Sequence, residues 1–211
     1  MKKALTFTLA ALLLALAACS THPPLDVSPV PSPEETFITI KGERYSTWLT
    51  ELSLNSVELT DEDIKPLAQM TNLQVLSIIG DDITDISPLA GLTTLSELNL
   101  QFNRITDISP LAGLIKLENL NLSHNEIADI APLAGLTALT SLYLDVNQIT
   151  DIAVLAGLPK IGILYLNNNL ITDVSPLLEL PKLHTLTVDN NPIEDTSPLE
   201  LLPTPNPANQ P

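Results

Sequence analysis

Through its middle the sequence repeats every 22 residues, and this period constrains the fold more than any other feature. Six consecutive units begin with Leu or Ile and carry further apolar residues three, five and ten positions later. The starting residues are Leu73, Leu95, Leu117, Leu139, Ile161 and Leu183. Each Leu-x-x-Leu-x-Leu segment predicts a short strand, because its last two leucines are two apart and share one face. A unit this small cannot bury its apolar side alone, so the units must stack and share one core.

The composition agrees with a stack of aliphatic layers and excludes several classes of protein. Aromatic residues make up 3% of the 211 residues, whereas hydrophobic residues make up 45%. The 9 Lys and Arg stand against 25 Asp and Glu, and this net charge of −16 argues against a nucleic-acid-binding surface, which needs clustered cations. A single cysteine excludes an internal disulfide framework and a cysteine-based zinc site.

The letters of the repeat resemble those of a known family. Residues 103–114 read Asn-Arg-Ile-Thr-Asp-Ile-Ser-Pro-Leu-Ala-Gly-Leu, which is similar almost letter for letter to the internalin-type repeat of bacterial leucine-rich-repeat proteins. The resemblance extends over residues 49–202, about seven units. It implies an α/β solenoid, a right-handed leucine-rich-repeat arc with a parallel β-sheet on its concave face and short 3₁₀ or α turns on its convex face.

Two polar residues recur in register with the leucines. An Asn follows the starting residue by eight positions in five of the six units, and Asp81 replaces it in the first. We expect this ladder to bond the backbone of the turn that leaves each strand. A second ladder, of Asp, follows four positions later and consists of Asp85, Asp107, Asp129, Asp151, Asp173 and Asp195. Its carboxylates either bind calcium or, as we favour, accept hydrogen bonds from backbone amides where the return segment begins.

The return segment in each unit is too short for a long helix. Ser-Pro pairs such as Ser109-Pro110 predict an N-cap and a first helical residue. Glycines some four residues later predict left-handed stops at Gly91, Gly113, Gly135 and Gly157. We therefore expect a single turn of 3₁₀ or α-helix in each unit.

The two ends of the stack depart from the repeat. Residues 37–48 predict an N-terminal cap, in which a short hairpin is followed by Trp48, the only tryptophan, closing over the first layer. The first unit has 24 residues, and we expect residues 60–63 to bulge. The last unit lacks an obvious cap, and residues 203–211 are expected to be a disordered tail.

Residues 1–18 resemble a lipoprotein signal peptide. Lys2 and Lys3 precede an apolar run that is too short for a secure transmembrane helix, and small residues lead to Cys19. The resemblance implies cleavage before Cys19 and acylation of the new N-terminus, which would anchor the chain to a membrane. Residues 19–36 then read as a Pro-rich tether. An ordinary secretory peptide is the alternative. With Ser20 after the cysteine, the resemblance implies a lipid-anchored protein of the cell envelope, at the outer membrane if the host is Gram-negative.

The residues between the leucines of each strand point away from the core, where a partner can reach them. Most of them are small and polar, but Tyr143 and Tyr165 stand side by side on neighbouring strands. Large amphipathic rings are typical of interface hot spots, although these two can instead simply pack on each other. The predicted partner site comprises Tyr143, Tyr165, Ile163, Asp145, Asn121, Asn167 and Val146.

The sequence predicts a binding protein rather than an enzyme. His124 and His184 are about three units apart and cannot share a metal ion, and no phosphate loop, paired zinc motif or nucleophile elbow appears. We predict no catalytic residues, no metal site, no cofactor and a monomer that binds no nucleic acid. The resemblance implies a protein partner, in adhesion or in contact with host or envelope proteins. A periplasm-facing structural or assembly scaffold is the alternative.

Overall fold

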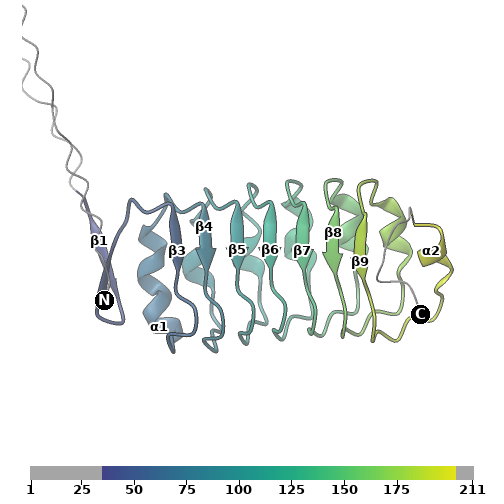
Figure 1. The fold of residues 1–211 in the computed structure, drawn as a ribbon, viewed down its shortest axis with the longest axis horizontal. Helices are drawn as coiled ribbons and strands as arrows, with labels where there is room; N and C mark the ends of the chain where they lie inside the picture. The colour runs from purple at the N-terminus through teal and green to yellow at the C-terminus, as the bar shows by residue number, and fades with distance from the viewer. Residues whose placement is uncertain (1–34, 203–211) are drawn as a thin grey trace, which may run out of the picture. The chain divides into compact units, whose positions relative to one another are not determined.

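The computed structural model describes residues 35–202, which form a row of parallel strands with short turns behind them (Figure 1). A two-stranded antiparallel sheet of β1 (Phe37–Ile40) and β2 (Glu43–Ser46) comes first. Seven strands then pair in chain order as one parallel sheet. These are β3 (Glu51–Ser53), β4 (Val75–Ser77), β5 (Glu97–Asn99), β6 (Asn119–Asn121), β7 (Ser141–Tyr143), β8 (Ile163–Tyr165) and β9 (Thr185–Thr187). The expected signal peptide, Cys19, nearly all of the tether and the tail lie outside the described residues.

The return segments after the first unit are single turns, as predicted, whereas the first unit returns through two consecutive ones. The first unit returns through α1 (Asp61–Ile64) and η1 (Lys65–Gln69), and the last through α2 (Ser197–Glu200). Between them lie the 3₁₀ turns η2 (Ser87–Leu89), η3 (Ser109–Leu111), η4 (Ala131–Gly135), η5 (Ala153–Gly157) and η6 (Ser175–Glu179). Among the residues that the structure describes, no helix is both long enough and apolar enough to cross a bilayer.

In the parallel sheet, equivalent residues of successive units lie side by side. Each strand pairs with the next at the same position of the following unit, as Leu98 does with Leu120. The leucine in the middle of every strand is therefore buried against its neighbours, and a buried leucine from the return turn, such as Leu111, closes the same layer. The buried apolar residues of the described chain run from Ile38 to Val188 as one cluster, so residues 20–211 contain this whole core. The predicted solenoid is confirmed.

The N-terminal cap is the predicted hairpin, but Trp48 does not close it. Alternation along β1 turns Ile38 and Ile40 toward the core, where both are buried. Trp48 lies beyond the end of β2 and is 49% exposed. The expectation for Trp48 was therefore wrong, because two branched aliphatic side chains already cover the first layer.

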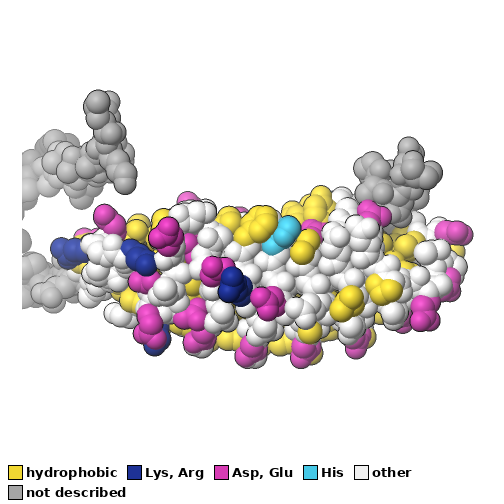
Figure 2. All heavy atoms as spheres, turned by 90° about the horizontal axis from the view of Figure 1, so that it is seen from below, with side chains coloured by type: hydrophobic (Ala, Val, Ile, Leu, Met, Phe, Trp, Pro, Cys, Tyr) yellow, Lys and Arg dark blue, Asp and Glu magenta, His cyan; other side chains and the backbone are white. Residues whose placement is uncertain are grey.

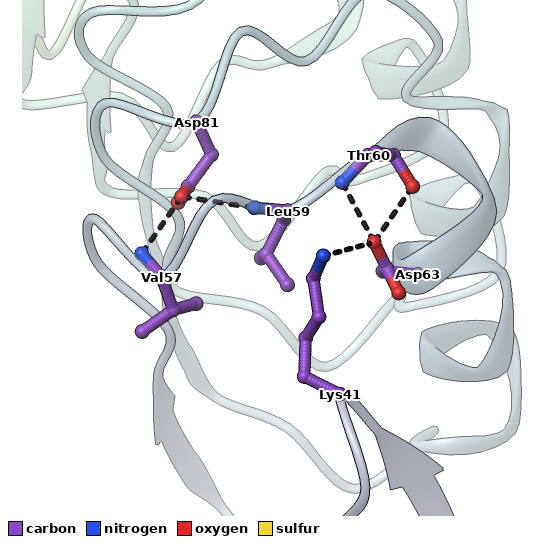
Figure 3. A network of polar contacts seen from close by, with 6 residues as sticks. All are labelled: Lys41, Val57, Leu59, Thr60, Asp63 and Asp81. Atoms are coloured by element: carbon purple, nitrogen blue, oxygen red, sulfur yellow. Dashed lines mark hydrogen bonds and ion pairs between the residues drawn. The ribbon is translucent and has the colours of Figure 1, made fainter.

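The extra residues of the first unit form a helical turn rather than a bulge. Thr60 precedes α1, and the Asp63 carboxylate accepts hydrogen bonds from its backbone N–H at 2.9 Å and from its hydroxyl at 2.6 Å (Figure 3). The ammonium of Lys41, in the turn of the hairpin, lies 3.2 Å from the same carboxylate (Figure 3). One acidic side chain thus caps α1 and joins it to the N-terminal hairpin.

Left-handed backbone lies at a different place in the unit from the one predicted. None of the four glycines expected to stop the return turns has a positive φ. A left-handed residue instead follows each strand, immediately before the ladder position, and the first two units have a second one, Glu58 and Asp82. The residue before the ladder position is Gly80 in the second unit and then Phe102, His124, Val146, Asn168 and Asn190. The 3₁₀ turns end in ordinary negative φ, so their glycines need no special conformation.

Both polar ladders bond the backbone. In the Asn ladder, the Asn125 carbonyl oxygen accepts from the Ile105 N–H at 3.0 Å, and its amide nitrogen donates to the carbonyls of Leu100 and Leu122, each at 3.0 Å. In the Asp ladder, every carboxylate accepts the N–H of the residue two positions later, at 2.8–2.9 Å. This confirms the backbone role that we favoured for the Asp ladder. It also shows that an Asp, rather than the following Ser, supplies the cap, since Ser109 is already the first residue of its turn.

Candidate partner-binding face

The outward face of the parallel sheet places Tyr143 and Tyr165 directly opposite each other. The two residues are register partners in β7 and β8, so their side chains leave the sheet at the same level. Their ring centroids are 5.0 Å apart and the ring planes meet at 82°, an edge-to-face contact. Both side chains are half-buried. The tyrosines therefore do pack on each other, and each keeps exposed surface for a partner.

The apolar members of the predicted site lie beside this pair in two different settings. Ile163 belongs to β8 and is half-buried next to its register partner Ser141, which is buried. Val146 lies at the corner that follows β7, is 37% exposed and has a φ of 55°. A left-handed φ is rare for a branched side chain, so Val146 is strained. The structure thus places Val146 on the edge of the face rather than within its rows.

The polar members of the site also serve the scaffold. The Asp145 carboxylate accepts the Asn167 N–H at 2.9 Å, and the Asn167 side-chain oxygen accepts the Asp189 N–H at 2.7 Å. The Asn121 side-chain oxygen accepts the Ser123 N–H at 3.0 Å. Burial raises the pKa of the Asp145 carboxyl above its ordinary value, and the Asn167 hydrogen bond and the nearby His124 ring only partly offset this. These side chains bond the backbone just after the strands. Only their polar atoms that are not used in these bonds are free to contact a partner.

A hollow of about 410 Å³ lies on the sheet face beside Tyr143. It extends across β4, β5, β6 and β7, with Val75 on one side and Tyr143 on the other. The side chains between them are small and polar, among them Ser77, Asn99 and Asn121, so the larger residues stand above this floor. The hollow connects the tyrosine pair with Glu97, which also lines it.

Models of a known protein family match four stretches of the chain. A model described as a leucine-rich repeat matches residues 45–68 and 91–108, and a model of two copies of the repeat matches residues 115–160 and 163–201. Together with the parallel sheet and the 3₁₀ returns, these matches decide the family. This is a leucine-rich-repeat protein.

Solved structures similar to this leucine-rich-repeat protein include two internalins of Listeria monocytogenes. The internalin InlF is 34% identical with a TM-score of 0.71, covering 75% of this chain and 47% of its own. The internalin C2 is 41% identical with a TM-score of 0.59, covering 65% of this chain and 59% of its own. The present chain thus spans about half the length of these internalins. No curated protein sequence matches it.

A third similar structure is a plant receptor. It is the peptide hormone receptor RGFR1 in complex with RGF2, 27% identical with a TM-score of 0.51. The match covers 60% of this leucine-rich-repeat protein and 22% of the receptor chain.

One exposed aromatic group of the leucine-rich-repeat protein was not predicted. Phe102 and His124 stack at the edge of the sheet, with ring centroids 4.1 Å apart and an interplanar angle of 25°. Phe102 is 49% exposed. Both residues occupy the left-handed corner after a strand, Phe102 two units and His124 one unit before Val146. Apart from Val146, the predicted site took its residues from the rows on the strands. The signal was present in the sequence, because these three residues are spaced by one repeat.

Acidic side chains dominate the surface of the leucine-rich-repeat protein. On the face that Figure 2 draws, Asp and Glu occur along the whole length, whereas the visible Lys and Arg lie in the half nearer the N-terminal hairpin. Among the described residues, the ion pairs join Lys41 to Asp63, Lys65 to Glu62, and Arg104 to Asp82. The carboxylates of the sheet face are therefore not paired with Lys or Arg within the described chain.

Proposed function

We propose that this leucine-rich-repeat protein is a lipid-anchored protein of the cell envelope that binds a protein partner through its sheet face, in adhesion or in contact with host or envelope proteins. The observation that carries the proposal is the pair of half-buried tyrosines, Tyr143 and Tyr165, standing beside a hollow on a rigid sheet. Rigid aromatic side chains lose little entropy on binding and are enriched among hot spots. The similarity to a receptor solved with its peptide hormone supports the same use of a repeat scaffold.

Replacing both tyrosines tests the face. We expect Tyr143→Ala with Tyr165→Ala to weaken partner binding by at least about 2 kcal/mol, the cost of losing a hot spot. The matched control is Leu178→Ala, which removes an exposed apolar side chain from the return turn η6. Residues 20–211 serve as bait in envelope and host extracts, and binding of each captured protein is then measured by titration. Equal affinity for the folded double variant and the parent chain contradicts the proposal.

The lipid anchor needs its own experiment. We expect Cys19→Ser to release the protein from membrane fractions or to leave it unprocessed, because no other residue of the expected leader can be acylated in the same way. The readout is fractionation together with the mass of the mature N-terminus. A Cys19→Ser chain that still fractionates as an acylated mature form excludes this anchor.

The alternative is a periplasm-facing scaffold that assembles another envelope protein on the same face. Brief protease treatment of intact cells separates the two. Loss of the repeat domain places the protein outside the cell and favours adhesion, whereas protection places it in the periplasm and favours the scaffold.

A further inference from the structure

The outward face of the parallel sheet carries negative charge and no positive charge. Each of the seven strands presents three outward positions, counting the residue that follows the strand by two. None of these positions holds Lys or Arg, and four of them hold an acidic residue. The acidic residues are Glu51, Glu97, Asp145 and Asp189. A partner that covers this face must therefore bring its own cations, or it leaves carboxylates without water and without a counter-charge.

Two of these carboxylates lie next to the apolar contact surfaces. Glu97 is exposed on β5 and lines the hollow between Val75 and Tyr143. Asp145 follows Tyr143 by two residues and is half-buried. Neither has a Lys or Arg nitrogen within 4.0 Å among the described residues. The two carboxylates therefore flank Tyr143, with Glu97 across the hollow on β5 and Asp145 two residues after Tyr143.

We propose that the partner binds this face through an extended basic segment, with Lys or Arg side chains on Glu97 and Asp145 and apolar side chains on Val75 and Tyr143. This inference rests on the proposed function, because it specifies the chemistry of the partner for the same face. An Arg at Asp145 also lies beside the tyrosine pair, whose ring faces attract cations. An acidic or purely neutral segment forfeits both ion pairs, so charge selects among partners of similar shape.

The separation of the two carboxylates sets the spacing of the basic residues. Glu97 and Asp145 are two strands apart, at about 4.8 Å per strand, and four positions apart along the strand, at about 3.3 Å per residue, which gives about 16 Å. An extended segment covers that distance in about five residues. Basic side chains about five residues apart therefore reach both carboxylates when the segment runs diagonally over the hollow.

Selection from a random peptide library tests the inference without knowledge of the natural partner. The probe is a phage-displayed library of peptides about twelve residues long, enough to cross the sheet when extended, and the target is residues 20–211. We expect the selected peptides to be enriched in Lys and Arg over the unselected library. Their affinity should fall when the ionic strength is raised from about 0.1 M to about 1 M, because the Debye length shortens from about 10 Å to about 3 Å.

A pair of charge variants assigns the effect to the face. Glu97→Gln with Asp145→Asn removes both charges, and Asn at position 145 keeps a side-chain oxygen for the Asn167 N–H. The matched control, Glu126→Gln with Glu179→Gln, makes the same change in net charge at exposed positions outside the rows. We expect a selected peptide to bind the face variant about tenfold more weakly and the control variant as tightly as the parent chain.

The outcomes separate this inference from the proposed function. Peptides without basic enrichment that nevertheless lose affinity for Tyr143→Ala with Tyr165→Ala overturn the basic segment and leave the tyrosine face standing. Peptides that bind the charge variant and the tyrosine variant as tightly as the parent overturn both. A library that yields no peptide above the blank surface overturns the extended segment, while the tyrosine variant in the extract experiment still decides the proposed function.

Discussion

Asp81→Asn should make the protein more stable, because Asp81 is the one member of the buried amide ladder that cannot donate a hydrogen bond. Its side chain is 4% exposed, and one carboxylate oxygen accepts the N–H groups of Val57 at 2.9 Å and Leu59 at 3.2 Å (Figure 3). The other oxygen is buried and has no hydrogen-bond partner among the described residues. A buried polar atom without a partner retains the full cost of leaving water.

The magnitude follows from the next unit, where the same position is Asn. There the Asn103 amide nitrogen donates to the carbonyls of Ile78 at 2.9 Å and Leu100 at 3.0 Å. By the register of β3 and β4, the carbonyls that correspond for an Asn at position 81 are those of Leu54 and Ile78. We expect this Asn to donate to both and still to accept from the amides of Val57 and Leu59. Two net hydrogen bonds at about 0.5–1.5 kcal/mol each raise the free energy of unfolding by about 1–3 kcal/mol.

Urea unfolding followed by far-UV circular dichroism measures the change, with the dependence on urea fitted separately for each variant because repeat proteins can unfold in segments. The reverse substitution, Asn125→Asp, is the matched control. It removes the two hydrogen bonds to the carbonyls of Leu100 and Leu122, which keep their bonds from Asn103 and Asn147, and it leaves a buried carboxylate oxygen without a donor. The free energy of unfolding should therefore fall by about 2–4 kcal/mol. An Asp81→Asn chain that is no more stable than the parent refutes this account of the ladder.

Two further predictions concern the corners and the acidic caps. Val146→Asn should raise the free energy of unfolding by about 1 kcal/mol, because Asn tolerates the left-handed φ of 55°, and Asn168→Val at the equivalent corner should lower it by a similar amount; the same urea assay checks both. The pKa values of Asp107, Asp173 and Asp195 are lowered by hydrogen bonds from the backbone N–H and hydroxyl of the Ser two positions later. Their charged forms therefore stabilise the fold above the unfolded pKa near 3.8, and this contribution disappears as the pH falls through the lower folded values. Replacing all three by Asn should reduce stability at neutral pH and leave a shallower loss on acidification, and identical slopes for variant and parent contradict that linkage.

The stacking of the units could be predicted because the period and the physics give the same answer. A leucine such as Leu98 has no other place to be buried than against the same leucine of the next unit, so the spacing alone implies a parallel sheet in register. The Asp caps could also be predicted, because a short carboxylate two residues before a turn has a local amide within reach. Both features depend on residues that lie at a fixed separation along the sequence.

The backbone conformation at the corners after the strands could not be predicted in the same way. Left-handed backbone is usually expected at Gly, and we therefore predicted it at the glycines of the return turns. Residues such as Phe102 and Val146 adopt it instead. The cause is that the stack fixes the corner, so whatever residue stands there must take its conformation. Aligning the units against one another shows the hint, since Gly80 and Asn168 occupy the same position.

The end of the stack shows a second limit. A tryptophan next to an exposed core layer is a reasonable cap from its size alone. The hairpin nevertheless meets the layer with Ile38 and Ile40, because strand alternation orients both toward it and leaves Trp48 past the last pair. The choice depends on where β2 ends, and element boundaries are the part of a strand that sequence determines least.

The residues that all units share cannot make binding specific, because every unit would then bind the partner equally well. The information must lie where units differ while the backbone stays the same, and on the sheet face these places are few. Tyr143 and Tyr165 stand where other units have Ser, Asn or Thr, and Glu97 stands over the hollow that those small side chains leave. Val146 occupies a corner at which Asn would be less strained. We therefore infer a binding role where a departure from the repeat adds strain to the fold, as at Val146. Stability and binding measured on the same variants test that link directly.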